Sequence, residues 1–503
     1  MNYLPATLLC DFYKISHREM YPSKTQTVYA TWTPRGSRVP DVDEVVVAGN
    51  QMLIKEFLMD FFDENFFERP AYAVEMEYKR VIKHCLGIEN PDAKHILELH
   101  ALRYLPLLIK GLPEGTVIPL RCPAMTIQNT DPKFFWLTNY VESLASCEIW
   151  PVYTAATIAR QYRKILDAAA MRTVGNTDFV QFQGHDFSLR GMMGVHAAVK
   201  TGIGHLLSFV GTDTIPAILA CEQFYHANIE KELVGTSIPA SEHSIQCAIE
   251  DDLKYITRLI TEVHPTGFVS VVCDGYDFWK VIREVIPALK DKIMARSGGP
   301  LGDRVVIRPD SGDPVKIVCG DPESGDPFVR KGAVECLWDI FGGTMTNKGF
   351  KLLDSHIGLI YGDAITLERA TEIVNRLEKK GFASINCVFG IGSYTYQYVT
   401  RDTFGFALKT TAAIIDGVEK QIWKDPKTDD GTKKSQKGRV AVYQDDEGNI
   451  KWQDGYDFAS SPSPELKDNL LVPIFEDGEL LVDDSLADIR KRLARASKPV
   501  VLA

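Results

Sequence analysis

Between about residues 178 and 394 the chain repeats one pattern: a short β-rich run that ends in a polar or glycine-rich turn, followed in several cases by a helical pattern. This alternation is typical of parallel βα units. It predicts an α/β fold built on a parallel sheet or barrel. The predicted strands are 179–182, 268–273, 305–307, 357–361 and 385–389, and the predicted helices are 277–295, 333–341 and 366–380.

The remaining sequence has a different texture and shows no simple repeat. Near the start, strands are predicted at 27–33 and 44–47 and an amphipathic helix at 51–62. Toward the end, six Lys or Arg and three Asp residues lie between 424 and 439, a composition that is usually a solvated loop. A hairpin turn at 445–449 and an amphipathic helix at 485–496 complete the prediction.

Charge and composition exclude several classes of protein. The 503 residues carry 56 basic and 67 acidic side chains, a net charge of −11, so broad attraction to nucleic acid or anionic lipid is not expected. No apolar run approaches the roughly 18 residues of a membrane span, and the start has no basic leader. We therefore expect a cytoplasmic protein. The ten cysteines form no Cys-x-x-Cys pair, so neither disulfides nor structural zinc are indicated.

The turns after the predicted strands are the expected place for a ligand, because parallel sheets and barrels bind at the carboxyl ends of their strands. Arg308 and Asp310 share one such turn. An arginine fork suits phosphate oxygens and a carboxylate suits two sugar hydroxyls, which together predict a ribose-phosphate site. The alternative is a buried Arg–Asp ion pair that closes the barrel. The other turns are Gly184–Phe187, Asp274–Asp277, Gly362–Ala364 and Gly390–Ser393.

Two further motifs in these turns have both a functional and a structural interpretation. The glycines of Gly390-Ile391-Gly392-Ser393 offer open backbone N–H groups to a phosphate, or form a plain turn, and they match neither a Rossmann nor a P-loop motif. His185 and His243 lack metal-ligand spacing, and a lone histidine is more often a core residue. Glu242 precedes His243 and would raise its basicity.

Taken together, the motifs resemble the nicotinamide phosphoribosyltransferase family, close relatives of the nicotinate phosphoribosyltransferases. The similarity covers nearly the whole chain. The matching segments are Asp11-Phe12-Tyr13-Lys14, Tyr21-Pro22, Asn129-Thr130-Asp131-Pro132, Trp136-Leu137-Thr138-Asn139, His185-Asp186-Phe187, Arg190-Gly191, Gly211-Thr212-Asp213-Thr214, 239–244, 307–312, Thr400-Arg401-Asp402, Lys424-Asp425-Pro426 and Lys437-Gly438-Arg439.

The resemblance implies a reaction and an architecture. The reaction is transfer of a 5-phosphoribosyl group from phosphoribosyl pyrophosphate to the ring nitrogen of nicotinamide, giving nicotinamide mononucleotide and pyrophosphate in NAD salvage. Mg²⁺ accompanies the pyrophosphate, and ATP stimulates turnover. The fold would be the irregular βα barrel of the type II phosphoribosyltransferases, at 178–394, with an α+β domain from 1–177 and 395–503 that contributes to the interface of a homodimer with shared active sites.

The resemblance also implies residue roles in substrate binding. Phe187 and Tyr13 would sandwich the pyridine ring, with Tyr13 contributed by the neighbouring subunit. Asp213 would accept the amide N–H. The remaining substrate contacts would be Arg190 and Arg308 on phosphate groups, Asp310, Gly362 and Asp363 on the ribose, and Gly392 and Ser393 in the last turn. Ser393 and Ala364 depart from the glycines that relatives often carry there.

A second set of residues would serve catalysis and ATP use. His243 matches the histidine that the family phosphorylates with ATP, and with Asp213, Arg308 and Asp310 it forms the expected catalytic set. No metal ligand is assigned. The residues expected to bind ATP or phosphate are Arg35, Glu242, His243, Arg401, Lys409, Lys424, Lys433 and Arg439.

Two other functions compete with this interpretation. A nicotinate phosphoribosyltransferase would run the same chemistry on the acid, and Asp213 argues against it. Two carboxylates ~4 Å apart repel by about 4 kcal/mol at an effective dielectric near 20, roughly a thousandfold discrimination. A non-enzymatic binding or signalling protein is the second alternative. Against it stands the presence of the expected residues for each step, namely His243, Asp310, the two arginines Arg190 and Arg308, and the two ring-stacking aromatics Tyr13 and Phe187.

Overall fold

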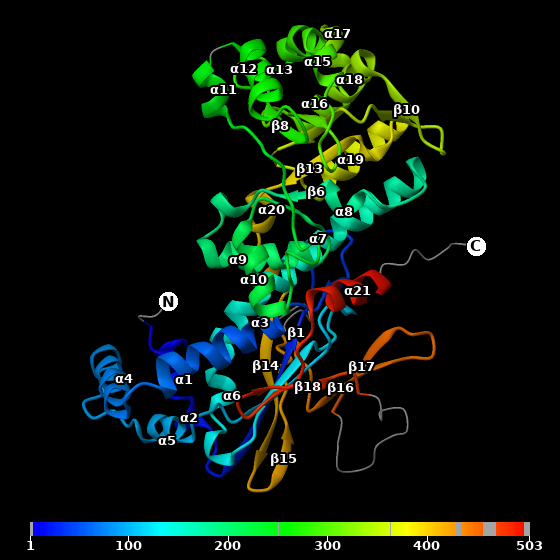
Figure 1. The fold of residues 1–503 in the computed structure, drawn as a ribbon. Helices are drawn as coiled ribbons and strands as arrows, with labels where there is room; N and C mark the ends of the chain where they lie inside the picture. Colours follow the sequence, from blue (N-terminus) through cyan, green and yellow to red (C-terminus); the bar gives the residue numbers. More distant parts are fainter. Residues whose placement is uncertain (1–3, 250, 363, 429–433, 456–468, 497–503) are drawn as a thin grey trace. The chain divides into compact units, whose positions relative to one another are not determined.

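The computed structural model describes residues 4–249, 251–362, 364–428, 434–455 and 469–496. The chain forms two compact units (Figure 1). The first contains Met1–Thr157, Ala220–Ala227 and Val399–Ala503, and the second contains Ile158–Leu219 and Asn228–Tyr398. Residues 158–177 thus group with the second unit and 220–227 with the first. The domain division at 177/178 and 394/395 stays a prediction.

The first unit is built on a seven-stranded antiparallel sheet with the order β15-β14-β1-β5-β3-β18-β19. Its long central pair joins the two ends of the chain, because β1 pairs with β14 from Thr25↔Ile415 to Thr33↔Ala407. The Trp32 ring stacks on Phe406 in the core, with ring centroids 5.2 Å apart. The strands are β1 Thr25–Thr33, β3 Leu107–Gly111, β5 Met125–Asn129, β14 Ala407–Ile415, β15 Val418–Gln421, β18 Val472–Glu476 and β19 Glu479–Leu480.

Helices and two small sheets surround this sheet, and the elements expected at 51–62, 445–449 and 485–496 are confirmed. The helices of the first unit are α1 Phe12–Ile15, α2 His17–Met20, α3 Asn50–Leu53 with its π-helical continuation Ile54–Phe61, α4 Ala71–Leu86, α5 Lys94–Leu102, α6 Leu137–Tyr140 and α21 Leu486–Ala496. The small sheets pair β2 Glu44–Val46 with β4 Val117–Pro119, and β16 Val440–Gln444 with β17 Ile450–Asp454.

The second unit is built on a six-stranded parallel sheet with the order β7-β6-β13-β12-β9-β8. The carboxyl ends of all six strands therefore meet at one edge. The strands are β6 Gly184–Asp186, β7 Gly211–Thr212, β8 Phe268–Val272, β9 Arg304–Arg308, β12 Ile357–Tyr361 and β13 Cys387–Ile391. The principal helices are α7 Glu142–Thr173 from residue 158 onward, α9 Val195–Leu206, α10 Ile215–Tyr225 up to residue 219, α11 His243–Ile249, α12 Asp252–Arg258, α13 Phe278–Lys280 with its continuation to Met294, α16 Pro314–Cys319, α17 Pro327–Lys331, α18 Ala333–Phe341, α19 Leu367–Lys379 and α20 Ser393–Tyr396; the remaining residues of α7 and α10 belong to the first unit.

An irregular segment, residues 236–241, links the two edge strands of this sheet. Thr236 bridges Gly211 of β7 in parallel, and Ala240 bridges Ser270 of β8. Four backbone hydrogen bonds hold the segment, two on each side. The parallel sheet therefore closes on itself through irregular backbone. The predicted α/β fold with an irregular βα barrel is confirmed.

One predicted strand, 179–182, is wrong, because Phe179 precedes a helix and residues 180–182 belong to it. The helix is α8 (Val180–Gln183), and the strand follows as β6. Val180 and Gln183 are the buried positions, and their spacing of three is helical. The strand consists of Gly184, His185 and Asp186 and so has no apolar side chain. Even a Cβ on Gly184 would lie only 2.9 Å from the Phe209 ring. The predicted strand 385–389 is present but begins at Cys387, after a short 3₁₀ turn.

Candidate active site

The carboxyl edge of the second unit's sheet carries most of the predicted substrate residues. Arg308 is the last residue of β9, and Arg190 lies in the short turn Leu189–Gly191 after β6. Asp363 lies outside the described residues. The other strand ends carry Phe187 after β6, Asp213 after β7, Asp274 after β8, Asp310 after β9, Gly362 after β12, and Gly392 and Ser393 after β13.

The Asp213 carboxylate is held at one of its two oxygens. His185 Nε2 donates to Oδ1 at 2.8 Å, and the Ser237 hydroxyl donates to the same atom at 2.6 Å. Burial raises the pKa of Asp213, but these hydrogen bonds and the charges of His185 and Arg308 outweigh it, so the pKa lies below its ordinary value. Asp213 is therefore ionised near neutral pH, and its Oδ2 accepts none of these hydrogen bonds.

An aromatic face lies next to this carboxylate. The ring of Phe187 packs at 37° to the ring of His185, with centroids 4.5 Å apart. The Phe187 N–H donates to the carbonyl of Ile391 at 2.9 Å, which fixes the turn after β6 against β13. A flat apolar ring beside an acceptor-only group matches a planar ligand that carries an N–H.

Asp274 joins the candidate phosphorylation residue to the Asp310 turn. Its Oδ1 accepts from His243 Nε2 at 2.9 Å. Its Oδ2 accepts from the backbone N–H groups of Asp310 and Ser311, at 2.8 and 2.7 Å, and from the Ser311 hydroxyl. Burial raises the pKa of Asp274, but these hydrogen bonds lower it by more than burial raises it, so the pKa lies below its ordinary value. An ionised carboxylate therefore orients the His243 ring.

The expectation that Glu242 would be the carboxylate beside His243 is wrong. The Glu242 carboxylate accepts from the Ser244 hydroxyl, and Asp274 contacts the imidazole instead. His243 is the first residue of α11, so neighbours in sequence point away from one another around the helix start. Asp274 was visible in the sequence as a strand-end residue, but its pairing depends on the barrel bringing α11 beside β8.

Arg308 and Asp310 support both interpretations weighed from the sequence. Arg308 Nε and Asp310 Oδ1 lie 3.6 Å apart, so the two form an ion pair. Arg308 also donates to the carbonyl of Ser241 at 2.6 Å. A Cβ on Gly362 would collide with Asp310 Oδ1, so any other residue there would displace the Asp310 carboxylate. The carboxylate and the Gly362 backbone are therefore in direct contact, as a shared ribose site would require.

The two departures from the family pattern have different structural settings. Ser393 begins α20, and its hydroxyl occupies the space in which a Cβ on Gly191 would lie. Ala364 has a φ of 55°, in the left-handed region. Glycine is favoured there, and an alanine costs roughly 1–2 kcal/mol.

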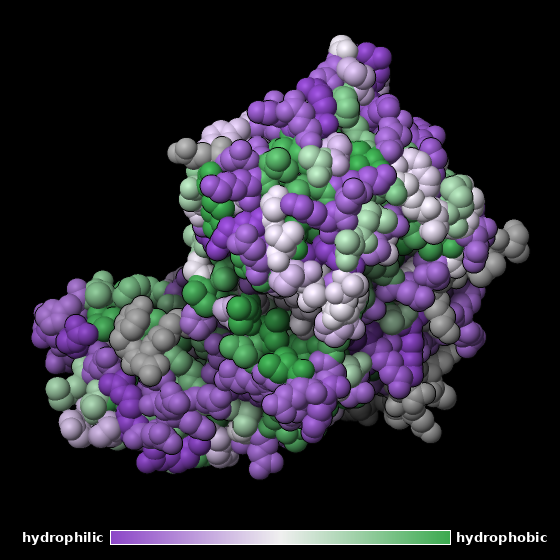
Figure 2. Space-filling view, turned by 45° about the horizontal axis from the view of Figure 1, so that its top comes forward, coloured by the Kyte–Doolittle hydropathy of each residue, from purple (hydrophilic) through white to green (hydrophobic). Residues whose placement is uncertain are grey.

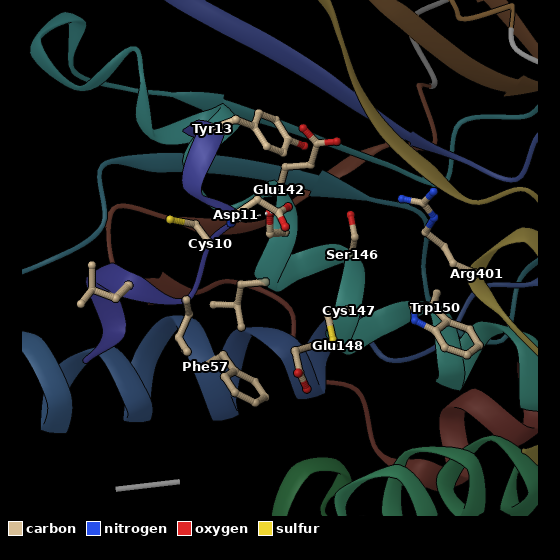
Figure 3. Close-up of a pocket in the computed structure, with 14 residues that line it drawn as sticks. Cys10, Asp11, Tyr13, Phe57, Glu142, Ser146, Cys147, Glu148, Trp150 and Arg401 are labelled. Atoms are coloured by element: carbon tan, nitrogen blue, oxygen red, sulfur yellow. Dashed lines mark hydrogen bonds between the residues drawn. The ribbon is translucent and has the colours of Figure 1, made fainter. Parts of the chain in front are cut away.

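A pocket of about 550 Å³ in the first unit contains two further predicted residues, Tyr13 and Arg401 (Figure 3). Figure 3 shows Ser146 and Arg401 on opposite sides of the same space. Glu142 also lines the pocket and accepts from Lys14 and, at 2.9 Å, from Lys409. One predicted aromatic and one predicted cation therefore line this pocket, and a second predicted cation, Lys409, contacts its Glu142.

Three other predicted phosphate-binding cations, Arg35, Lys424 and Arg439, do not line this pocket. Arg35 donates to the carbonyl of Gly405 at 2.9 Å, and Lys424 is exposed. Arg439 donates to Glu419 and Gln128, at 2.9 and 3.0 Å, and covers the Tyr29 ring. Lys433 lies outside the described residues. Their predicted role in ATP or phosphate binding stays a prediction.

Comparison with known proteins identifies the family. The model of the nicotinate phosphoribosyltransferase (NAPRTase) family matches residues 182–460. The nicotinamide phosphoribosyltransferase of Acinetobacter baylyi is 47% identical over 495 residues, 96% of each chain. The chain belongs to this family. It is an enzyme of the pentosyltransferase class, and the resemblance seen in the sequence is confirmed.

Two further matches have lower identity. The nicotinamide phosphoribosyltransferase of Mycoplasma pneumoniae is 34% identical to this family member, over 87% of this chain and 96% of that one. The crystal structure of nicotinate-nucleotide pyrophosphorylase from Pyrococcus furiosus superposes with a TM-score of 0.59 at 16% identity, over 98% of this chain and 95% of that one. The structural match supports the fold alone. Within the described residues, no helix is both long and apolar enough for a membrane span.

Proposed function

We propose that the chain is a cytoplasmic nicotinamide phosphoribosyltransferase of NAD salvage, which makes nicotinamide mononucleotide and pyrophosphate from nicotinamide and phosphoribosyl pyrophosphate. The observation that carries this proposal is the Asp213 carboxylate, ionised and held by His185 and Ser237 beside the Phe187 ring. A carboxylate only accepts hydrogen bonds, so it suits the amide of nicotinamide. Both curated relatives described above carry the name of this enzyme.

In the proposed reaction the bond from ribose C1 to pyrophosphate oxygen breaks, and the ring nitrogen of nicotinamide forms a bond to C1. The nitrogen supplies the electron pair, the pyrophosphate leaves with the pair of the broken bond, and no proton moves. Positive charge develops at C1, so positioning and electrostatics dominate. Asp310 would hold the ribose, Arg190 and Arg308 the phosphates, and Asp213 with Phe187 the base.

Mg²⁺ would arrive with the substrate. Such an ion commonly binds through one or two carboxylates together with substrate phosphates. Across the described residues, no group of three or more His, Cys, Asp and Glu side chains is arranged to hold a metal ion. Substrate oxygens together with a strand-end carboxylate such as Asp310 would hold the ion, which would neutralise charge on the pyrophosphate.

ATP would stimulate the reaction through His243. Its Nε2 donates to Asp274, which leaves the lone pair on Nδ1. Nδ1 would attack the γ-phosphorus of ATP, a P–N bond would form, and the bond to the ADP oxygen would break. Water then hydrolyses the phosphohistidine.

A comparison of two bases tests the proposed function. Purified enzyme is given phosphoribosyl pyrophosphate and Mg²⁺ with nicotinamide or nicotinate, with and without ATP, and the mononucleotide formed is quantified. We expect nicotinamide to be used with a specificity constant at least a hundredfold higher, and ATP to raise it. A preference for nicotinate would instead establish the alternative, a nicotinate phosphoribosyltransferase.

We further propose that the enzyme is a homodimer in which each active site takes Tyr13 from the partner. The pocket that Tyr13 and Arg401 line supports this. All its lining residues belong to the first unit, and they offer an aromatic ring and a guanidinium that the barrel of another copy could use.

Apolar residues gather in places on the largely hydrophilic surface in Figure 2. Exposed examples are Phe12 and Met20 in the first unit and Met193 and Tyr398 in the second. A partner copy would cover such residues.

Mixed dimers test the shared site. Tyr13→Ala and Asp310→Ala homodimers should each be nearly inactive. When they are unfolded, mixed equally and refolded, about half the dimers are mixed, and each mixed dimer has one intact site and one doubly damaged site. About a quarter of wild-type activity should return. No recovery, in a mixture shown by differential tagging to contain heterodimers, would place both residues in one chain's site.

A further inference from the structure

His205 is a fully buried histidine on α9 that none of the steps above uses. Its Nε2 lies 2.9 Å from the carbonyl oxygen of Gly211, and its Nδ1 lies 2.7 Å from the Tyr396 hydroxyl. A carbonyl only accepts, so Nε2 carries the hydrogen. The Tyr396 hydroxyl then donates to Nδ1 of a neutral ring. One imidazole therefore connects the end of β7 with α20.

Aromatic packing fixes the direction of this ring. His205 stacks on Phe209 with centroids 5.3 Å apart and an angle of 25°, and meets Tyr396 edge-on at 5.8 Å. Phe209 is itself held close to the backbone of Gly184. The Nε2–H of His205 can therefore point in one direction, toward Gly211.

Gly211 is the residue through which His205 reaches the site. β7 has two residues, Gly211 and Thr212, and Asp213 follows directly. A Cβ on Gly211 would lie 2.8 Å from Nδ1 of His185, whose other nitrogen donates to Asp213. A shift of Gly211 would therefore disturb Asp213 twice, through the chain and through His185.

We propose that His205 is a positioning residue that sets the orientation of the Asp213 carboxylate and thereby the selectivity for an amide over an acid. The inference rests on the proposed function, in which Asp213 receives the amide. β7 has only two residues, which pair with β6 and with Thr236, and the Nε2–H bond adds a side-chain anchor on the Gly211 carbonyl. Without it, Oδ2 of Asp213 would lose its fixed direction toward the base.

Two amide substitutions isolate this hydrogen bond. The side-chain nitrogen of glutamine can reach the place of Nε2, whereas that of asparagine matches Nδ1. We expect His205→Gln to keep the nicotinamide-to-nicotinate ratio of specificity constants within threefold of wild type. His205→Asn should lower the ratio at least tenfold, mainly by raising KM for nicotinamide, with KM for phosphoribosyl pyrophosphate within threefold. Equal ratios in the two variants would overturn the proposal.

A second pair of variants decides the question if a buried amide prevents folding, which thermal unfolding would reveal. Tyr396→Phe removes the hydroxyl that fixes Nδ1 and leaves both rings, so the ratio should fall two- to fivefold. Tyr162→Phe is the matched control, since the equally buried Tyr162 hydroxyl donates to the Ile365 carbonyl at 2.7 Å without touching His205. The same ratio in both Phe variants would refute the role of His205.

The wild-type measurement separates this inference from the proposed function. A wild-type enzyme that does not convert nicotinamide refutes the proposed function itself. An active wild type whose His205→Asn variant folds and keeps the same selectivity refutes only the positioning role.

Discussion

Asp213→Asn should reverse much of the discrimination between nicotinamide and nicotinate. In the proposed function the native carboxylate accepts the amide N–H, and it would repel the nicotinate carboxylate by about 4 kcal/mol at ~4 Å and an effective dielectric near 20. Asparagine removes that repulsion and can donate to an acid. We expect the nicotinamide-to-nicotinate ratio of specificity constants to fall by two to three orders of magnitude, measured with both bases under identical phosphoribosyl pyrophosphate and Mg²⁺.

The control is Asp291→Asn, which makes the same chemical change at an exposed position on the helix that ends at Met294. Its selectivity should equal that of wild type. Asp213→Asn enzyme that folds, remains active and retains the wild-type ratio would show that Asp213 does not recognise the base.

His243→Ala should abolish ATP hydrolysis and all stimulation by ATP while leaving a slow basal transfer. The substitution removes the proposed nucleophile, but the residues that would hold base, ribose and phosphate remain. Hydrolysis is followed as release of inorganic phosphate from ATP, and basal transfer as mononucleotide formed without ATP. A stable phosphoenzyme trapped by acid-free electrophoresis in wild type should be absent from the variant.

His264→Ala is the matched control, because it removes a partly exposed histidine side chain elsewhere in the same unit. ATP hydrolysis by this control should be unchanged. Stimulation by ATP that survives in folded His243→Ala enzyme would exclude the phosphohistidine route and leave ATP a binding effector at most.

Strand and helix positions could be predicted wherever the buried residues are themselves apolar. The strand 357–361 and the helix 333–341 match the structure residue for residue. The strand is a continuous buried run, and the buried residues of the helix recur with the helical period. The strand β6 could not be found in this way. It consists of Gly184, His185 and Asp186, and it is a strand because its neighbours β7 and β13 pair with its backbone.

The site also contains residues that local sequence predicts and contacts that depend on residues far away in the chain. The strand end that carries Arg308 and Asp310 follows from the βα pattern, whereas Asp213 was found only through the family resemblance, since no strand was predicted at 211–212. The partners of the site residues follow from neither, since His185 and Asp213 are 28 positions apart and His243 and Asp274 are 31 apart. Ser237 and Ser241 gain their contacts through the irregular closure of the barrel at 236–241, which carries no periodic signal.

The close approach of Ser393 to Gly191 links two positions about 200 residues apart in the chain. The Ser393 hydroxyl fills the volume that any side chain at 191 would need, so only one of the two positions can carry a side chain while the backbone keeps its course. Substitutions at the two sites are therefore not independent. Descendants of this sequence that acquire alanine at 191 should carry glycine at 393, and libraries that vary this corner of the enzyme should encode the two codons together.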